Sequence, residues 1–272
     1  MRLLPNTVEG LLWGLENFDG VEFDIRLTMD SKLVIHHDPI LTDGTVIANN
    51  SLVEIKERRI PSLNDFLSNV KVKELLEIGR TLWIELKPNC QGKKPVFQQI
   101  ADAFRKALEE DLQKNNINFN SIRLISFNKD ILDSFVDKFA CYPILPFVNE
   151  CNPSFVTLKA LPRVLAKSLT WHINEAVNRK FQGVTYARQY MMGLFAIRHP
   201  KYKKVVELSK TTGIELGTNL GTPDLEAEYS YLHRFTDKTH VYPRHAKSGE
   251  GKIIAHRGTG TKGIELPDKT VE

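Results

Sequence analysis

The sequence predicts an α/β protein of the closed (β/α)8 TIM barrel class, and three observations support this. Eight short apolar segments have strand composition, and a helix-sized segment separates each from the next. Alternating strands and helices are typical of a parallel sheet, and eight such units close a barrel. The length of 272 residues suits a single domain, which we expect to span residues 1–272. The expected strands start near residues 21, 82, 122, 141, 183, 214, 239 and 253.

The helix signals are clearest in the first third of the chain. Apolar residues recur at helical spacing after Thr7, a suitable N-cap, and the segment ends at Asp19-Gly20. Ser62 begins a second helix, since Asp65 follows three residues later in a weak capping box, and Gly79 ends the helical stretch. Residues 42–50 resemble a loop. Further helices are expected at residues 96–114, 129–138, 161–179, 201–210 and 223–234.

Charged residues alternate with apolar residues in two of the expected strands. Glu22, Asp24 and Arg26 share one face of the strand at residues 21–26, and Glu85 and Lys87 share one face of the strand at 81–87. In a (β/α)8 barrel, active-site residues gather at the carboxyl ends of the strands. We therefore expect these side chains to lie near one mouth of the barrel.

Three carboxylates, those of Glu22, Asp24 and Glu85, would converge there. Like charges this close cannot all remain ionised unless a cation neutralises them. Ligands that are all oxygen atoms select a hard divalent ion, Mg²⁺ or Ca²⁺. The alternative is structural, with Arg26 pairing with the first two carboxylates and Lys87 neutralising the third.

Two further strand ends carry histidine. The segment at residues 253–258 ends in His256-Arg257-Gly258, and the segment at residues 34–38 ends in His37-Asp38. Arg257 and Lys87 could hold phosphate oxygens, while His37 and His256 could serve as acid and base on opposite sides of the phosphorus.

The neighbouring His36 should point to the opposite side of its strand and is expected to be a packing or supporting residue. His36-His37-Asp38 also contains a His-x-Asp spacing that occurs in non-haem iron sites, but the alternating helices disfavour the all-β scaffold in which such sites usually occur.

Several motifs together resemble the glycerophosphodiester phosphodiesterase family, over nearly the whole chain and more weakly after residue 150. They are Asn6-Thr7, Glu22-x-Asp24 with Arg26-Leu27-Thr28, His37-Asp38, Ile60-Pro61-Ser62-Leu63, Glu85-Leu86-Lys87 and His256-Arg257-Gly258. The resemblance implies a metal-dependent (β/α)8 barrel that hydrolyses glycerophosphodiesters to an alcohol and glycerol phosphate. It also implies metal ligands at Glu22, Asp24 and Glu85, catalytic histidines at His37 and His256, and phosphate-contacting cations at Arg257 and Lys87.

The chain departs from the family pattern in two ways. Pro5 stands where the family has Glu in Pro-Glu-Asn-Thr, and a looser echo of that motif lies at residues 267–270. The His-Arg-Gly motif also comes last, whereas it opens the family sequence. This order resembles a circular permutation in which the family's first strand, at about residues 252–258, lies at the C-terminal end and residues 247–251 form the new bridge.

Bulk properties restrict the partners. The net charge of +4 comes without a concentrated basic stretch, so we expect a small-molecule substrate and no nucleic acid. Three cysteines without a Cys-x-x-Cys pair favour a reducing cytoplasm. No apolar run suits a signal peptide or a membrane span, so stable membrane insertion is not expected. The oligomeric state is not predicted.

The sequence therefore predicts metal-dependent hydrolysis of glycerophosphodiesters with acid-base catalysis by two histidines. One alternative is a phospholipase D-like enzyme that acts on lysolipids, which would need an apolar groove at the mouth. Another is a non-catalytic phosphodiester-binding protein, if the changed motif order has spoiled the site. Whether water or an internal hydroxyl of the substrate attacks, and which histidine is the acid, stay open.

Overall fold

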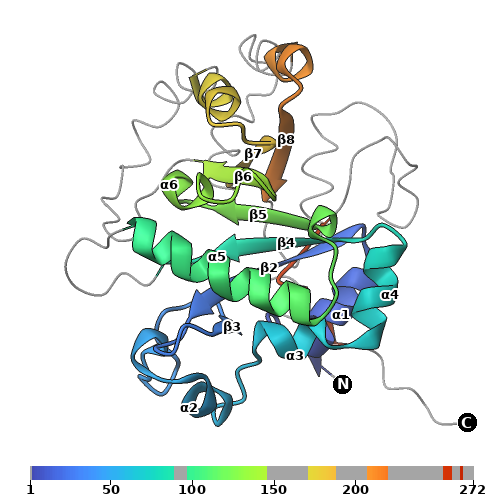
Figure 1. The fold of residues 1–272 in the computed structure, drawn as a ribbon. Helices are drawn as coiled ribbons and strands as arrows, with labels where there is room; N and C mark the ends of the chain where they lie inside the picture. Colours follow the sequence, from blue (N-terminus) through green and yellow to red (C-terminus); the bar gives the residue numbers. More distant parts are fainter. Residues whose placement is uncertain are drawn as a thin grey trace, which may run out of the picture. The chain divides into compact units, whose positions relative to one another are not determined.

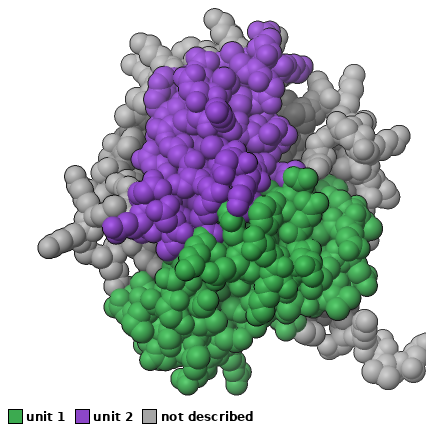
Figure 2. All heavy atoms as spheres, viewed as in Figure 1, with its two compact units in different colours: residues 1–89, 106–122, 221–272 green, residues 90–105, 123–220 purple. Residues whose placement is uncertain are grey.

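The computed structural model describes residues 2–88, 97–145, 171–187, 207–219, 254–258 and 264–265. The chain divides into two compact units, which Figure 2 shows in different colours. Unit 1 comprises residues 1–89, 106–122 and 221–272, and unit 2 comprises residues 90–105 and 123–220. The organisation as one domain over residues 1–272 stays a prediction.

Strand β2 (Gly20–Leu27) forms the centre of unit 1 (Figure 1), and all eight of its residues are buried. β4 (Thr81–Leu86) pairs with it in parallel. β9 (Ile254–His256) pairs in parallel with the beginning of β2, and β3 (Leu33–Ile35) pairs antiparallel with its end. β9 and β4 therefore both run alongside β2, the strand that carries Glu22 and Asp24.

Helix α1 (Val8–Asn17) contacts both β2 and β9. Thr7 is its N-cap, as predicted, and its hydroxyl accepts a hydrogen bond from the backbone N–H of Gly10. Ser62 likewise caps α3 (Leu63–Leu67) in a capping box with Asp65. The other elements of unit 1 are β1 (Arg2–Leu3), η1 (Ile47–Asn49), α2 (Leu52–Lys56), α4 (Val70–Glu77), η2 (Phe119–Ser121) and β10 (Ile264–Glu265), which pairs with β1.

The end of β9 packs closely against α1 because glycines lie on both sides. Gly258 has a φ of +80°, and a Cβ atom there would lie 2.4 Å from the carbonyl oxygen of Gly10. A Cβ atom on Gly14 would lie 2.7 Å from the carbonyl oxygen of Gly258. Both approaches are too short for a side chain. The His-Arg-Gly motif thus reaches its position only because glycine occupies these sites.

Unit 2 is built around parallel pairs of strands joined by helical segments (Figure 1), as the alternating pattern predicts. The elements of unit 2 are β5 (Ile122–Ser126), α6 (Lys129–Leu132), β6 (Ala140–Leu145), a helix at 171–178, β7 (Gly183–Ala187), a helix at 207–212 and β8 (Glu215–Asn219). β5 and β6 have the predicted bounds, whereas α6 ends before the predicted residue 138 and continues as turns. Helix α5 (Phe97–Lys114) spans the boundary between the units.

Residues 42–50 form the expected loop, and it includes one short 3₁₀ helix, η1 (Ile47–Asn49). Ile47 is fully buried and opens η1, and it belongs to a small apolar core with Val34, Leu41 and Ile55. Burial of the Ile47 side chain in this core stabilises the position of η1. The predicted strand at residues 239–242, the helix at 223–234 and the bridge at 247–251 lie outside the described residues. In the part of the chain that the structure describes, no helix combines the length and apolar character needed to cross a membrane.

Candidate active site

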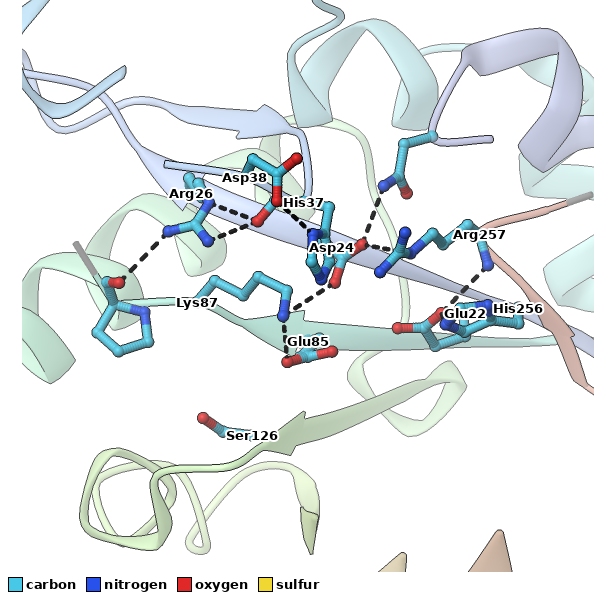
Figure 3. Close-up of polar contacts among 12 residues, drawn as sticks. Glu22, Asp24, Arg26, His37, Asp38, Glu85, Lys87, Ser126, His256 and Arg257 are labelled. Atoms are coloured by element: carbon cyan, nitrogen blue, oxygen red, sulfur yellow. Dashed lines mark hydrogen bonds and ion pairs between the residues drawn. The ribbon is translucent and has the colours of Figure 1, made fainter. Parts of the chain in front are cut away.

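All seven predicted site residues lie in unit 1 and come together beside β2, where β4 and β9 end (Figure 3). The strand register explains this convergence. Glu22 of β2 lies opposite His256 of β9, and Asp24 lies opposite Glu85 of β4. The remaining residues, His37, Lys87 and Arg257, each follow directly or closely after a strand that pairs with β2.

Three buried carboxylates form the centre of the site. Glu22, Asp24 and Glu85 are 5%, 1% and 4% exposed, and each offers an oxygen atom within 4.8 Å of the other two. Oε1 of Glu22 is buried and has no hydrogen-bond partner among the described residues. An unsatisfied buried carboxylate oxygen is costly unless a cation binds it. The three residues therefore fit a hard divalent cation as an all-oxygen set of ligands.

The pKa values of these carboxyls reflect crowding of negative charge. Burial, followed by the charges of Asp24 and Glu85, raises the pKa of Glu22 well above its usual range. Burial also acts to raise the pKa of Asp24, but the positive charges of Lys87 and Arg257 outweigh it and hold that pKa below its usual range. The cluster thus holds at least one carboxyl whose ionisation an added cation would favour.

Two cations border the carboxylates. Nζ of Lys87 lies 2.6 Å from Oε1 of Glu85 and 3.4 Å from Oδ1 of Asp24. Nε of Arg257 lies 3.2 Å from Oδ2 of Asp24, and the backbone N–H of Arg257 donates to Oε2 of Glu22. Lys87 thus neutralises Glu85, as the structural alternative expects. A fifth of the Arg257 side chain is exposed, so this cation is accessible from outside the cluster.

The two predicted histidines reach the cluster from different strands. Nδ1 of His37 lies 2.7 Å from Oδ1 of Asp38, and Nε2 of His256 lies 3.6 Å from Oε2 of Glu22. Burial, then the charge of Lys87, lowers the pKa of His37. Burial, then the charge of Arg257, lowers the pKa of His256 to about 4. Both imidazoles are therefore neutral near pH 7, and His37 is oriented by the carboxylate of Asp38.

His36, the neighbour of His37, takes part in the sheet through its backbone. Its backbone N–H donates to the carbonyl oxygen of Asp24, which continues the β2–β3 pairing by one bond. The Asp38 carboxylate bonds the ring of His37, its immediate neighbour. Among the described residues, the one group of three or more ligating side chains within reach of a single metal ion contains carboxylates alone. The geometry therefore favours the oxygen site over a His-x-Asp iron site.

Two residues that the sequence did not single out as site residues support those that it did. Asn6 is buried with a φ of 56°, its Nδ2 donates to Oδ2 of Asp24 over 2.9 Å, and its backbone N–H donates to the carbonyl of Arg257. Arg26 donates from Nε and Nη2 to the carbonyl oxygen of His37, and from Nη1 to that of Pro88. Asn6-Thr7 and Arg26-Leu27-Thr28 both belong to the motifs that resemble the family, and strand alternation also places Arg26 on the face of Glu22 and Asp24, but neither signal shows which atoms these side chains bond.

Comparison with solved structures shows the fold class. The chain superposes on a glycerophosphodiester phosphodiesterase from Parabacteroides distasonis with a TM-score of 0.59 and 18% identity, covering 93% of this chain and 86% of that one. For the enzyme from Thermotoga maritima the TM-score is 0.55 at 17% identity, covering 93% and 88%. For a phosphodiesterase from Oleispira antarctica in complex with the product sn-glycerol-3-phosphate, it is 0.54 at 18%, covering 85% of each chain. A comparison of the chain with curated proteins found no match.

A family model identifies the family to which the chain belongs. The glycerophosphoryl diester phosphodiesterase family matches residues 3–251, so the chain belongs to that family. The resemblance predicted from the sequence is confirmed, and with it the (β/α)8 barrel fold class and the enzyme class, a phosphodiesterase. The matched segment ends before His256, so the family assignment does not depend on the C-terminal motif.

Proposed function

We propose that this protein hydrolyses glycerophosphodiesters to an alcohol and glycerol phosphate in a metal-dependent reaction, with His37 and His256 as acid and base. The observation that carries the proposal is the convergence, inside one compact unit, of three buried carboxylates, an accessible arginine and two neutral imidazoles. These groups match the needs of phosphodiester hydrolysis: charge neutralisation, anion binding and proton transfer.

Glu22, Asp24 and Glu85 would hold the divalent ion, Mg²⁺ or Ca²⁺. When bound, such an ion withdraws negative charge from a phosphate oxygen and makes the phosphorus more susceptible to attack. The raised pKa of Glu22 and its unsatisfied Oε1 support this assignment, because both reflect negative charge that the surrounding residues do not fully balance. Lys87 offsets part of this negative charge by pairing with Glu85.

Arg257 is the residue best placed to receive the phosphate. Its guanidinium is partly exposed, and Asp24 fixes one side of it. A planar guanidinium with a fixed edge can offer its other donors to two phosphate oxygens at once. Lys87 would shift part of its interaction from Glu85 to the phosphate when the substrate and the ion share the charge of the cluster.

His37 and His256 would carry the protons. Since Nδ1 of His37 bonds Asp38, Nε2 is the nitrogen that exchanges a proton with the substrate. One histidine, neutral, takes a proton from the attacking oxygen. The other must first bind a proton, which the negative charge of the bound phosphodiester would favour, and it then gives that proton to the departing alcohol. Attack by water and attack by the substrate's own hydroxyl through a cyclic intermediate both satisfy this arrangement.

We also propose that β9 takes the place of the family's first strand, as expected for a circular permutation. The parallel pairing of β9 with β2 and the packing of Gly258 on α1 support it, because they put His-Arg-Gly beside the carboxylates despite its late position in the sequence. This arrangement favours a working site over the non-catalytic alternative.

A cytoplasmic location belongs to the same proposal. Of the three cysteines, Cys141 lies in the described residues, where it is buried as a free thiol. Burial also raises the pKa of this thiol, which makes it unreactive. A buried, unpaired thiol agrees with a reducing compartment.

The test is hydrolysis of glycerophosphocholine by the purified protein, with choline and glycerol phosphate measured separately. We expect both products from the wild type and a loss of at least a hundredfold in each of the His37→Ala and His256→Ala variants. Lysophosphatidylcholine in detergent is the second substrate. Faster turnover of the lysolipid would favour the phospholipase D-like alternative, and binding of either compound without turnover would favour a non-catalytic protein.

A further inference from the structure

Arg26 is a buried cation whose donors point to the main chain. The residue is 5% exposed and lies on the same face of β2 as Glu22 and Asp24. A guanidinium stays charged at any physiological pH, so its burial is costly unless acceptors surround it. Nε and Nη2 both donate to the carbonyl oxygen of His37, and Nη1 donates to that of Pro88 over 3.3 Å (Figure 3).

These two carbonyls belong to segments that have just left the sheet. The pairing of β3 with β2 ends at Ile35, and the last bond on that side runs from the N–H of His36 to the carbonyl of Asp24. On the other side, the N–H of Lys87 donates to the carbonyl of Ile25. His37 and Pro88 are each the next residue along the chain. The side chain of Arg26 therefore holds, by hydrogen bonds, the first residue beyond the main-chain pairing on each side of β2.

We propose that Arg26 is a positioning residue that acts through His37. This inference rests on the proposed function, in which His37 exchanges a proton with the substrate. Two donors on one carbonyl oxygen fix the backbone of His37, and the Asp38 carboxylate then orients the ring. Since the same guanidinium also bonds Pro88, it sets His37 relative to the end of β4, where Lys87 and Glu85 lie. Arg26 itself need not touch the substrate.

Replacement of Arg26 by lysine separates the effect of its hydrogen-bonding geometry from the effect of its positive charge. Arg26→Lys retains the positive charge but has a single nitrogen, which cannot reproduce the fork that reaches two carbonyls. Arg26→Gln removes the charge and serves as the second variant. Arg58→Lys is the matched control, because Arg58 also bonds a main-chain carbonyl, that of Glu54, and is a surface residue outside the site.

The first arm of the test is a double-mutant cycle on glycerophosphocholine hydrolysis. For Arg26→Lys we expect kcat to fall roughly ten- to a hundredfold with KM changed less than about threefold, the pattern of a misplaced catalytic group. In the His37→Ala background the same substitution should cost less than about threefold more, because the residue through which it acts is gone. Full multiplication of the two losses, or wild-type kcat in Arg26→Lys, would overturn the inference.

The second arm does not depend on activity. Hydrogen–deuterium exchange should be faster in Arg26→Lys and Arg26→Gln for a peptide that covers residues 36–39, and unchanged for α3 and in the Arg58→Lys control. Unchanged exchange at 36–39 would contradict the inference even if activity falls. If the wild type hydrolyses no glycerophosphodiester, the proposed function fails, whereas the exchange measurement still decides whether Arg26 holds His37.

Discussion

The backbone N–H of Arg257 donates to Oε2 of Glu22 over 3.1 Å, although 235 residues separate the two in the sequence. The bond is possible because β9 pairs with β2 and places His256 opposite Glu22. Arg257 adopts a φ of 51°, which directs its N–H to the carboxylate while its side chain reaches Asp24. β9 and the residue that follows it therefore supply an imidazole, a hydrogen bond and a cation to a cluster built from the first half of the chain.

Replacement of Gly258 tests this dependence. In Gly258→Ala the new Cβ would collide with the Gly10 carbonyl, so we expect β9 to shift and the hydrolysis rate to fall at least tenfold. Gly44→Ala is the matched control, since Gly44 also has a positive φ of 86° but has open space around it. The control should lose about 1 kcal/mol of stability through backbone strain and keep its activity. Equal activity of the two variants would show that the packing of β9 on α1 is unimportant.

Removal of one carboxylate should strongly weaken metal binding. Glu85→Gln leaves the side-chain shape but removes a charge from a set in which all three oxygens lie within 4.8 Å of one another. We expect Mn²⁺ affinity, measured by calorimetry, to fall at least a hundredfold, with hydrolysis falling in parallel. Glu74→Gln is the control, because Glu74 is an exposed residue paired with Lys71. Wild-type Mn²⁺ affinity in Glu85→Gln would remove that residue from the ligand set.

Asn6 should strengthen Mn²⁺ binding although it is not itself a proposed ligand of the ion. Its amide donates to Oδ2 of Asp24, and loss of such an outer hydrogen bond typically weakens metal binding ten- to a hundredfold. Asn6→Ala is therefore expected to bind Mn²⁺ more weakly than the wild type and more tightly than Glu85→Gln. Calorimetry under the same conditions ranks the three proteins, and an affinity equal to that of the wild type would contradict the prediction.

His172 should make the folded state sensitive to acid. Burial lowers the pKa of this residue to about 4, and its ring packs against Trp171. Between pH 4 and 6.5 the folded state binds fewer protons than the unfolded state, so stability falls as the pH falls, by up to ~1.4 kcal/mol per pH unit. In His172→Gln this slope should be shallower. Denaturant unfolding at pH 4.5, 5.5 and 6.5 measures it, and identical slopes would exclude His172 as the source.

The site could be predicted from the sequence because its residues are attached to strands. Period-two alternation places Glu22 and Asp24 on one face regardless of the tertiary details, and the strand ends then carry His37 and Lys87 to the same edge. The helix caps at Thr7 and Ser62 are equally local. These features depend on a few neighbouring residues, which explains why the sequence alone indicated them.

What the sequence did not predict depends on long-range contact. The bonds of Arg26 to two carbonyls carry no residue-type signal at the acceptor, since every residue has a carbonyl. The burial of Ile47 depends on a core formed with Val34 and Ile55 rather than on its own polar neighbourhood. Such contacts are set by packing after the strands have assembled.

Metal dependence and the role of the C-terminal histidine are tested together by glycerophosphocholine hydrolysis with the wild type after chelation with EDTA, followed by addition of excess Mg²⁺ or Ca²⁺. We expect EDTA to abolish turnover and at least one of the two ions to restore it, and we expect neither ion to restore turnover in Glu85→Gln or His256→Ala. Turnover that persists in EDTA and in both variants would contradict the assignment of the carboxylate cluster and of the C-terminal histidine.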